Sequence, residues 1–127
     1  MQDSGRNSDP FMEGNAMQDK NIKHQALTDV NDSVLIVIDV QQSFLEKMPK
    51  EQTLPLINRI SWIVKMTVKL NIPIIATAED IPEERGNVAQ IADFFPEGTQ
   101  EHNKMCFGLT GDPIILSAVE KTNRKTA

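Results

Sequence analysis

The sequence predicts an α/β protein with a parallel β-sheet. Residues Val34–Val40, "VLIVIDV", and Ile72–Ala78, "IPIIATA", are short runs rich in apolar, mostly β-branched residues. Runs with so little alternation are typical of strands that are covered on both faces, as in parallel sheets. Between the two runs apolar residues recur at helical spacing, which predicts a crossover helix and one right-handed βαβ unit.

The crossover helix is expected to begin near Thr53, a residue type that can cap a first turn, with Pro55 close behind it. Asn71 and Pro73 are expected to end it, because asparagine favours helix ends and proline cannot continue a helix. The residues of the expected buried face are Leu56, Ile60, Ile63, Val64 and Thr67.

The second half of the sequence predicts one clear helix and one long connection. Asp112 followed by Pro113 is a strong helix start, so we expect a helix from Pro113 to about Lys121. The segment 79–102 holds two prolines and two glycines, which predicts a long connection with one short helix around Val88–Phe94.

The last five residues, "NRKTA", form a polar turn of the kind that normally leads into another strand. No further strand follows in the sequence before Ala127. Two parallel strands with two helices leave open edges and uncovered faces, whereas parallel sheets occur as larger, doubly covered assemblies. The sequence therefore predicts an incomplete fold, the front half of an α/β domain.

Length and composition indicate a single domain, since 127 residues support one hydrophobic core. We expect this domain to span residues 32–127. A flexible polar tail is expected over residues 1–31, with a short helix near Ile22–Leu27, because the tail has too few apolar residues to form a core.

The net charge of −5 disfavours nucleic acid and anionic membranes as partners and favours a small-molecule substrate or another protein. No apolar run approaches the roughly 20 residues that a membrane span needs, and the amino-terminal residues do not resemble a secretory signal. A single cysteine fits a reducing compartment. We therefore expect a cytoplasmic protein.

Asp39 and Lys104 are the candidate site residues. Asp39 stands at the carboxyl end of the first predicted strand, the edge at which open α/β sheets bind ligands, and a carboxylate among apolar residues needs a partner if it is buried. Lys104 precedes "MCF" and can reach the same edge to pair with Asp39. The alternatives are an aspartate that caps the next loop and a lysine that is simply solvated.

Cys106 is the single cysteine in the sequence. A free cysteine between apolar residues such as Met105 and Phe107 is more often a small buried side chain than a reactive thiolate. No base or helix start follows it immediately. We therefore expect Cys106 to be a structural thiol.

No metal or cofactor site is predicted. His24 and His102 have no second ligand at zinc-like spacing. The segment after the first strand, "DVQQSFLEKMP", has no glycine, which argues against a dinucleotide site or a P-loop. Ser43 lacks the G-x-S-x-G context of a hydrolase serine.

Three motifs together resemble those of the isochorismatase-like cysteine hydrolases in order and spacing. They are "VLIVIDVQQSFL" at 34–45, "IPIIATAED" at 72–80 and "KMCFGLTGDP" at 104–113, and the resemblance covers about residues 33–127. It implies a three-layer, Rossmann-like parallel sheet flanked by helices. It also implies hydrolysis of a C–N bond in a small amide, or of a related substrate.

By this resemblance Asp39 matches the catalytic base of the family, and Lys104 matches the lysine before the third motif. The nucleophilic cysteine of the family lies further on, at a helix start after the next strand, and does not match Cys106. In this sequence that position would fall beyond Ala127. The resemblance therefore implies a hydrolase that is inactive as the chain stands.

Two other hypotheses remain. The chain can be a non-catalytic relative that acts as a binding or assembly module, since open sheet edges favour association and a homo-oligomer. A phosphate-receiving signalling domain is the third and weakest hypothesis. It requires an acidic pair on the first strand, whereas this sequence offers only Glu79 and Asp80, after the second.

Overall fold

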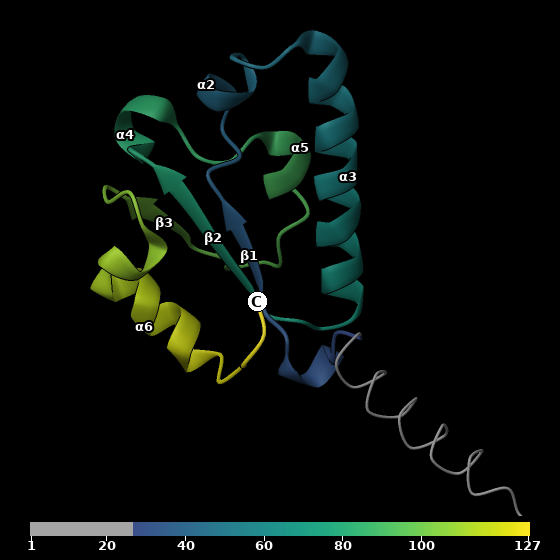
Figure 1. Cartoon of the computed structure of the whole chain (residues 1–127), viewed down its shortest axis with the longest axis vertical. Helices are drawn as coiled ribbons and strands as arrows, with labels where there is room; N and C mark the ends of the chain where they lie inside the picture. Colours follow the sequence, from purple (N-terminus) through teal and green to yellow (C-terminus); the bar gives the residue numbers. More distant parts are fainter. Residues whose placement is uncertain (1–26) are drawn as a thin grey trace, which may run out of the picture.

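A parallel three-stranded sheet forms the centre of the structure, a computed structural model that describes residues 27–127 (Figure 1). The strands are β1 (Leu35–Ile38), β2 (Ile74–Glu79) and β3 (Glu101–Lys104), and β2 lies between the other two. Both neighbouring pairs are parallel. The predicted α/β class and parallel sheet are therefore confirmed.

Strand β3, with the sequence "EHNK", was not predicted, and its first two residues were assigned to the long connection. It is a short edge strand, and it pairs with β2 in a register that sets Ala76 opposite Glu101 and Glu79 opposite Lys104. Backbone hydrogen bonds to β2 place this segment in the sheet. Its four side chains are all polar, so the sequence has no apolar periodicity there that would indicate a strand.

The crossover helix α3 spans Lys50–Lys69 and begins earlier than predicted. Pro49 occupies the N-cap position, while Thr53 lies within the helix and donates its hydroxyl to Pro49 O at 3.2 Å. Pro55 also lies inside the helix. The predicted start at Thr53 is therefore wrong, because a proline one turn earlier supplies the extended residue that precedes the first turn.

No helix within residues 27–127 is both long enough and apolar enough to cross a bilayer.

Helix α3 packs on one face of the sheet together with the short helix α5 (Ala89–Ala92), which lies within the predicted Val88–Phe94 segment. The core beneath these helices contains side chains from strands β1 and β2, from the segments of α3 and α5, and from Leu45, which lies between β1 and α3. Its buried members are Val37, Leu45, Ile57, Val64, Ala76, Val88 and Ile91.

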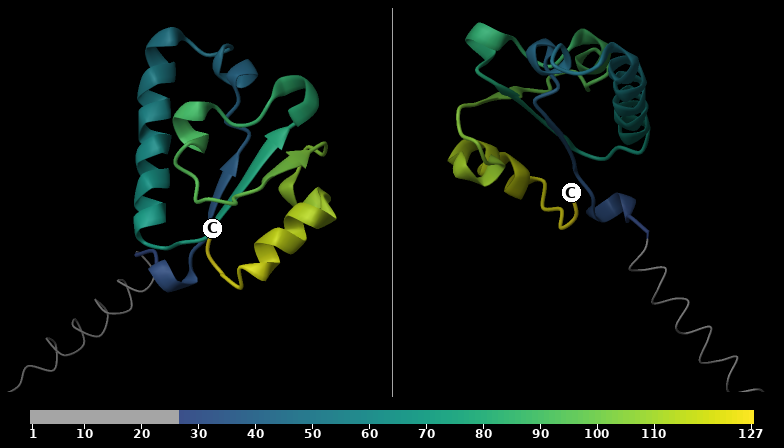
Figure 2. Two further views of the ribbon diagram at one scale, coloured as in Figure 1. Left: turned by 180° about the vertical axis from the view of Figure 1, so that it is seen from behind. Right: turned by 45° about the horizontal axis from the view of Figure 1, so that its top comes forward.

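Helix α6 (Pro113–Lys121) packs against β2 from the other face of the sheet, so the fold has three layers (Figure 2). Its bounds are those predicted. Asp112 caps it as expected, since Oδ1 accepts hydrogen bonds from the backbone N–H groups of Ile114 and Ile115 at 2.8 and 3.3 Å. Ile115 is its one buried residue.

Four short elements complete the described chain: η1 (Val30–Asp32), α2 (Gln42–Leu45), α4 (Ile81–Glu84) and η2 (Leu109–Gly111). Helices α2 and α4 lie close to the carboxyl ends of β1 and β2 (Figure 1). Residues 1–26 lie outside the described residues, and with them most of the predicted tail and of its short helix near Ile22–Leu27.

The turn after α6 brings the chain back to the outer edge of β1. Thr126 forms a parallel bridge with Ser33 and accepts a hydrogen bond from Val34 N–H at 2.9 Å. Along that edge the backbone groups of Ile36 and Ile38 point away from β2, and within residues 27–127 no strand pairs with them. The outer edge of β1 is therefore open just beyond the point where Thr126 joins it.

Candidate active site

Asp39 follows β1 directly and lies in a left-handed backbone conformation, with φ 52°. Aspartate tolerates this conformation better than most residues, since its short side chain can bond locally. The turn is held by Asp39 N–H donating to Thr77 O at 3.0 Å and by Gln41 N–H donating to Asp39 O at 2.9 Å. The carboxylate is only 15% exposed, and its Oδ1 accepts the Thr77 hydroxyl at 2.9 Å.

Lys104 ends β3 and is buried, with its Nζ 2.9 Å from Asp39 Oδ2. The same ammonium donates to the backbone carbonyl of Cys106 at 3.1 Å. The ion pair therefore reaches across the end of β2, from the strand on one side to the strand on the other. The readings of a solvated lysine and of a solvated or loop-capping aspartate are wrong, because both side chains are withdrawn from water and bonded to each other. Their catalytic roles stay a prediction.

A cavity of about 440 Å³ opens beside this pair. Its walls are mainly apolar and its charged groups are two carboxylates and one ammonium, an arrangement suited to a small polar molecule with an apolar body. The lining residues are Ile38, Asp39, Phe44, Glu79, Lys104, Phe107 and Leu109.

Cys106 is exposed, so the expectation of a buried thiol is wrong. Its neighbours Met105 and Phe107 are also exposed, at 66% and 106%, because the chain leaves the sheet after Lys104 and runs along the surface. Its Sγ lies 3.8 Å from Gly111 O, and no hydrogen bond among the described residues joins it to Asp39. The thiol is therefore not hydrogen-bonded to the carboxylate of Asp39.

Gln41 is a site residue that sequence reasoning missed. Its side chain is fully buried and holds the backbone of Glu79 from both sides, donating to Glu79 O and accepting from Glu79 N–H, each at 2.8 Å. It also donates to Arg85 O at 2.6 Å. Gln41 thus fixes the end of β2 against the turn that follows β1. A polar residue two positions after Asp39 was visible in the sequence, but its backbone partners were not.

Asn87 is the second missed residue, and it ties all three strands together. Its Oδ1 accepts from Val40 N–H at 2.8 Å, while its Nδ2 donates to Thr77 O at 3.1 Å and to Glu101 Oε1 at 2.6 Å. The preceding glycine, Gly86, leaves room for Glu101, since a Cβ there would lie 2.5 Å from Glu101 Oε2. This network joins the turn after β1 and the middle of β2 to the first residue of β3.

We expect Gln41→Leu to lower the free energy of unfolding by about 2 kcal/mol, because it removes three part-buried hydrogen bonds from the buried Gln41 amide to the backbone of Glu79 and Arg85. Urea denaturation measures the change. Gln42→Leu is the control, since Gln42 is exposed and its side-chain hydrogen bond goes only to Glu46. Equal stability of the two variants would contradict the structural role of Gln41.

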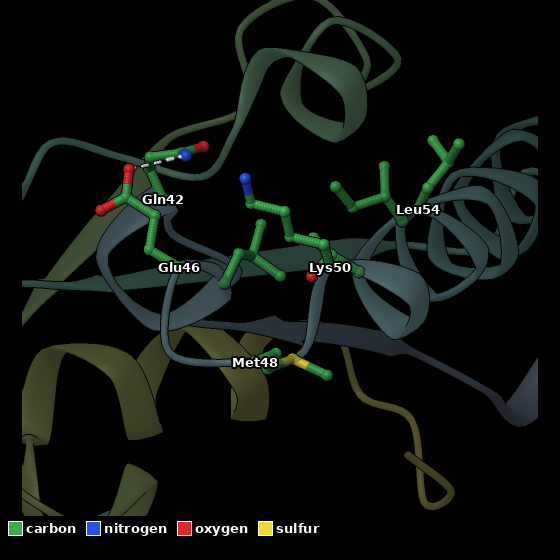
Figure 3. Close-up of a pocket in the computed structure, with 8 residues that line it drawn as sticks. Gln42, Glu46, Met48, Lys50 and Leu54 are labelled. Atoms are coloured by element: carbon green, nitrogen blue, oxygen red, sulfur yellow. Dashed lines mark hydrogen bonds between the residues drawn. The ribbon is translucent and has the colours of Figure 1, made fainter.

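A second cavity, of about 360 Å³, lies between α2 and the start of α3 (Figure 3). A hydrogen bond of 2.9 Å between Gln42 and Glu46 lies at one end of it and Leu54 at the other, with Lys50 between them. It does not include the Asp39–Lys104 pair. Within residues 27–127 no three His, Cys, Asp or Glu side chains are grouped so as to hold a metal ion.

Two solved structures share the α/β fold of this chain. YcaC from Pseudomonas aeruginosa, solved with hexane-2,5-diol and covalent acrylamide, is 17% identical with a TM-score of 0.65 over 80% of this chain and 52% of its own. The MAR1 ribonuclease from Caenorhabditis elegans is 23% identical with a TM-score of 0.59, over 76% and 48%. The chain thus spans about half the length of each.

At these identities the likeness establishes the fold and leaves the activity open. No protein-family model matches the sequence, and no curated protein is significantly similar to it.

Proposed function

We propose that the Asp39–Lys104 pair is the base and the cation of a hydrolase site for a small amide. The observation that carries this proposal is the ion pair itself, buried and 2.9 Å long at the edge of the sheet where α/β folds bind ligands. The adjoining cavity has the size and the mixed polarity of a small-molecule site. The resemblance of the three sequence motifs to the isochorismatase-like hydrolases supports the same function.

Asp39 is the proton acceptor in this proposal. Its two carboxylate oxygens each hold one partner, Thr77 or Lys104, and each keeps a further lone pair for a proton. It takes the proton from the attacking group as that group bonds to the amide carbon. The proton then passes to the leaving amine as the C–N bond breaks.

Lys104 stabilises the charge that develops on the amide oxygen. An ammonium has three N–H donors, and two are used by Asp39 and by the carbonyl of Cys106. The third is available to the substrate oxygen, where a buried positive charge favours the tetrahedral intermediate over the planar amide.

The attacking group is the part of the reaction that the described side chains do not provide. Among the described side chains, those of Thr77 and Lys104 are bonded to Asp39, while the thiol of Cys106 bonds to Gly111 O. The resemblance implies a cysteine nucleophile, which gives a thioester that water then hydrolyses. An added small thiol can take the place of that cysteine in a direct test.

The test measures amine release from small aromatic amides and activated anilides, with and without ethanethiol. We expect little turnover with water alone and a rate that rises with ethanethiol, saturates with substrate and is lost in Asp39→Asn. Turnover without thiol would mean that water can attack in this site, which also supports the proposal. No rate above that of Asp39→Asn under either condition would overturn it.

A polyanionic substrate fits this site poorly. The name of MAR1 describes it as a ribonuclease, yet the present chain has a net charge of −5 and two carboxylates beside one ammonium at the cavity. Nucleic-acid binding depends on cationic groups that neutralise phosphates. These charges favour a small uncharged or cationic substrate.

A second candidate function is assembly through the outer edge of β1, with a second copy of this chain as the partner. Ile36 and Ile38 have no strand beside them in residues 27–127, and Ile38 is 50% exposed. A cavity of about 220 Å³ runs between this strand and α3, lined by Ile60, Ile63 and Val64 on the helix side. Open apolar edges are sites of strand pairing between chains.

If this edge joins two copies, the mass measured by light scattering should rise with concentration from 14.2 kDa toward twice that value. Ile36→Lys should keep the protein monomeric, because a charged edge residue opposes strand pairing. Leu54→Lys is the control, since Leu54 is 64% exposed on α3 and does not line this edge. A monomer at every concentration would contradict the assembly function.

A further inference from the structure

We propose that the cavity beside the Asp39–Lys104 pair selects a cationic amide, and that Glu79 is the residue that recognises the positive charge. The inference rests on the proposed function in placing an amide oxygen against Lys104. Beyond that function, the inference specifies that the substrate is positively charged and that Glu79 recognises this charge.

The charges around the cavity are unbalanced. The ammonium of Lys104 is already paired with Asp39, and this is the one ion pair among residues 27–127. Glu79 also lines the cavity, and its carboxylate has no hydrogen bond or ion pair with any described residue. The net charge facing the cavity is therefore negative, and the unpaired group is a carboxylate.

Glu79 is held in this position by its backbone. It is the last residue of β2 and lies opposite Lys104 in the register with β3, so the two side chains belong to the same part of the sheet edge. The buried amide of Gln41 bonds both its N–H and its carbonyl. The side chain is exposed while the backbone is fixed, which suits a group that binds a ligand and gains little from the fold itself.

The aromatic walls of the cavity also favour a cation. Phe44 is 38% exposed and Phe107 is fully exposed, so both rings can offer a face to a ligand. Phe44 already attracts one cation, because Lys47 Nζ lies 5.1 Å from its ring centroid. Aromatic faces next to a carboxylate are the usual surroundings of a bound organic cation.

A set of three ligands tests the charge preference while the carbamoyl ring stays nearly constant. These ligands are 1-methylnicotinamide (cationic), nicotinamide (neutral) and 3-carbamoylbenzoate (anionic). Their dissociation constants are measured by NMR titration of the isotope-labelled protein, without any nucleophile. We expect the cation to bind about tenfold more tightly than the neutral ligand, from the carboxylate and the ring faces together, and the anion to bind most weakly.

Glu79→Gln should reduce the preference for the cation to about twofold, while Glu83→Gln should leave it unchanged. Glu83 is the matched control because it is exposed on α4 and does not line the cavity. Equal binding of all three ligands, a preference that survives Glu79→Gln, or no binding of any of them would overturn the inference. These dissociation constants do not depend on turnover. If the test of amine release with ethanethiol fails, a preference for the cation that is lost in Glu79→Gln still supports a cation-binding site at Glu79.

Discussion

Replacing Asp39 by asparagine is expected to lower the thiol-dependent rate of amide cleavage about 1,000-fold, the usual contribution of a well-placed general base. The amide side chain keeps the shape of the carboxylate. Its oxygen can accept a hydrogen bond from Lys104, while its NH2 group can donate to the hydroxyl oxygen of Thr77. Asparagine also tolerates the left-handed conformation of this residue, whose φ is 52°. The variant therefore removes the proton acceptor and, with it, the counter-ion of Lys104, so circular dichroism must show that the variant is folded before the rates are compared.

Steady-state kinetics with ethanethiol and a small anilide measure this effect. Asp80→Asn is the matched control, because Asp80 has φ 44°, follows β2 in the same way that Asp39 follows β1, and does not line the cavity. We expect the control to keep the wild-type kcat. A similar loss in both variants, or in neither, would mean that Asp39 does not act as the base.

The second large effect is on stability. Lys104→Met should lower the free energy of unfolding by about 4 kcal/mol, because it leaves the buried carboxylate of Asp39 without its counter-ion. The methionine side chain is similar in length and apolar, so the loss reports the charge more than the packing. Urea denaturation at neutral pH, monitored by circular dichroism, gives the value.

Two further variants separate the ion pair from general damage. Lys125→Met should change the stability little, because the Lys125 side chain is exposed and only its backbone N–H bonds to Asp32. The double variant Asp39→Asn, Lys104→Met should be more stable than Lys104→Met alone, since it no longer buries an unpaired charge. If the double variant lost as much stability as the two single variants Asp39→Asn and Lys104→Met lose together, this account would be contradicted.

The parts of the fold that could be predicted from the sequence are those with strong local signals. Runs of apolar, mostly β-branched residues predict strands β1 and β2, and Asp112 with Pro113 predicts the start of α6. These signals are local, because strand burial and helix capping depend on residues within a few positions of one another. The same local reasoning put Asp39 at the carboxyl edge of the sheet.

Local signals misled at two points. The start of α3 was placed at Thr53, although Pro49 one turn earlier begins the helix. Cys106 was expected to be buried because Met105 and Phe107 flank it, yet all three are exposed, since apolar neighbours in sequence do not decide which way a surface loop turns its side chains.

The sequence by itself determined the α/β class, the two apolar strands, the last helix and the edge that carries Asp39. Only the tertiary structure decided that "EHNK" is the third strand, that Lys104 meets Asp39 across the end of β2, and that Gln41 and Asn87 hold that edge together. The reason is physical: these features depend on backbone pairing and hydrogen bonds between segments tens of residues apart, which leave no periodic pattern in either segment.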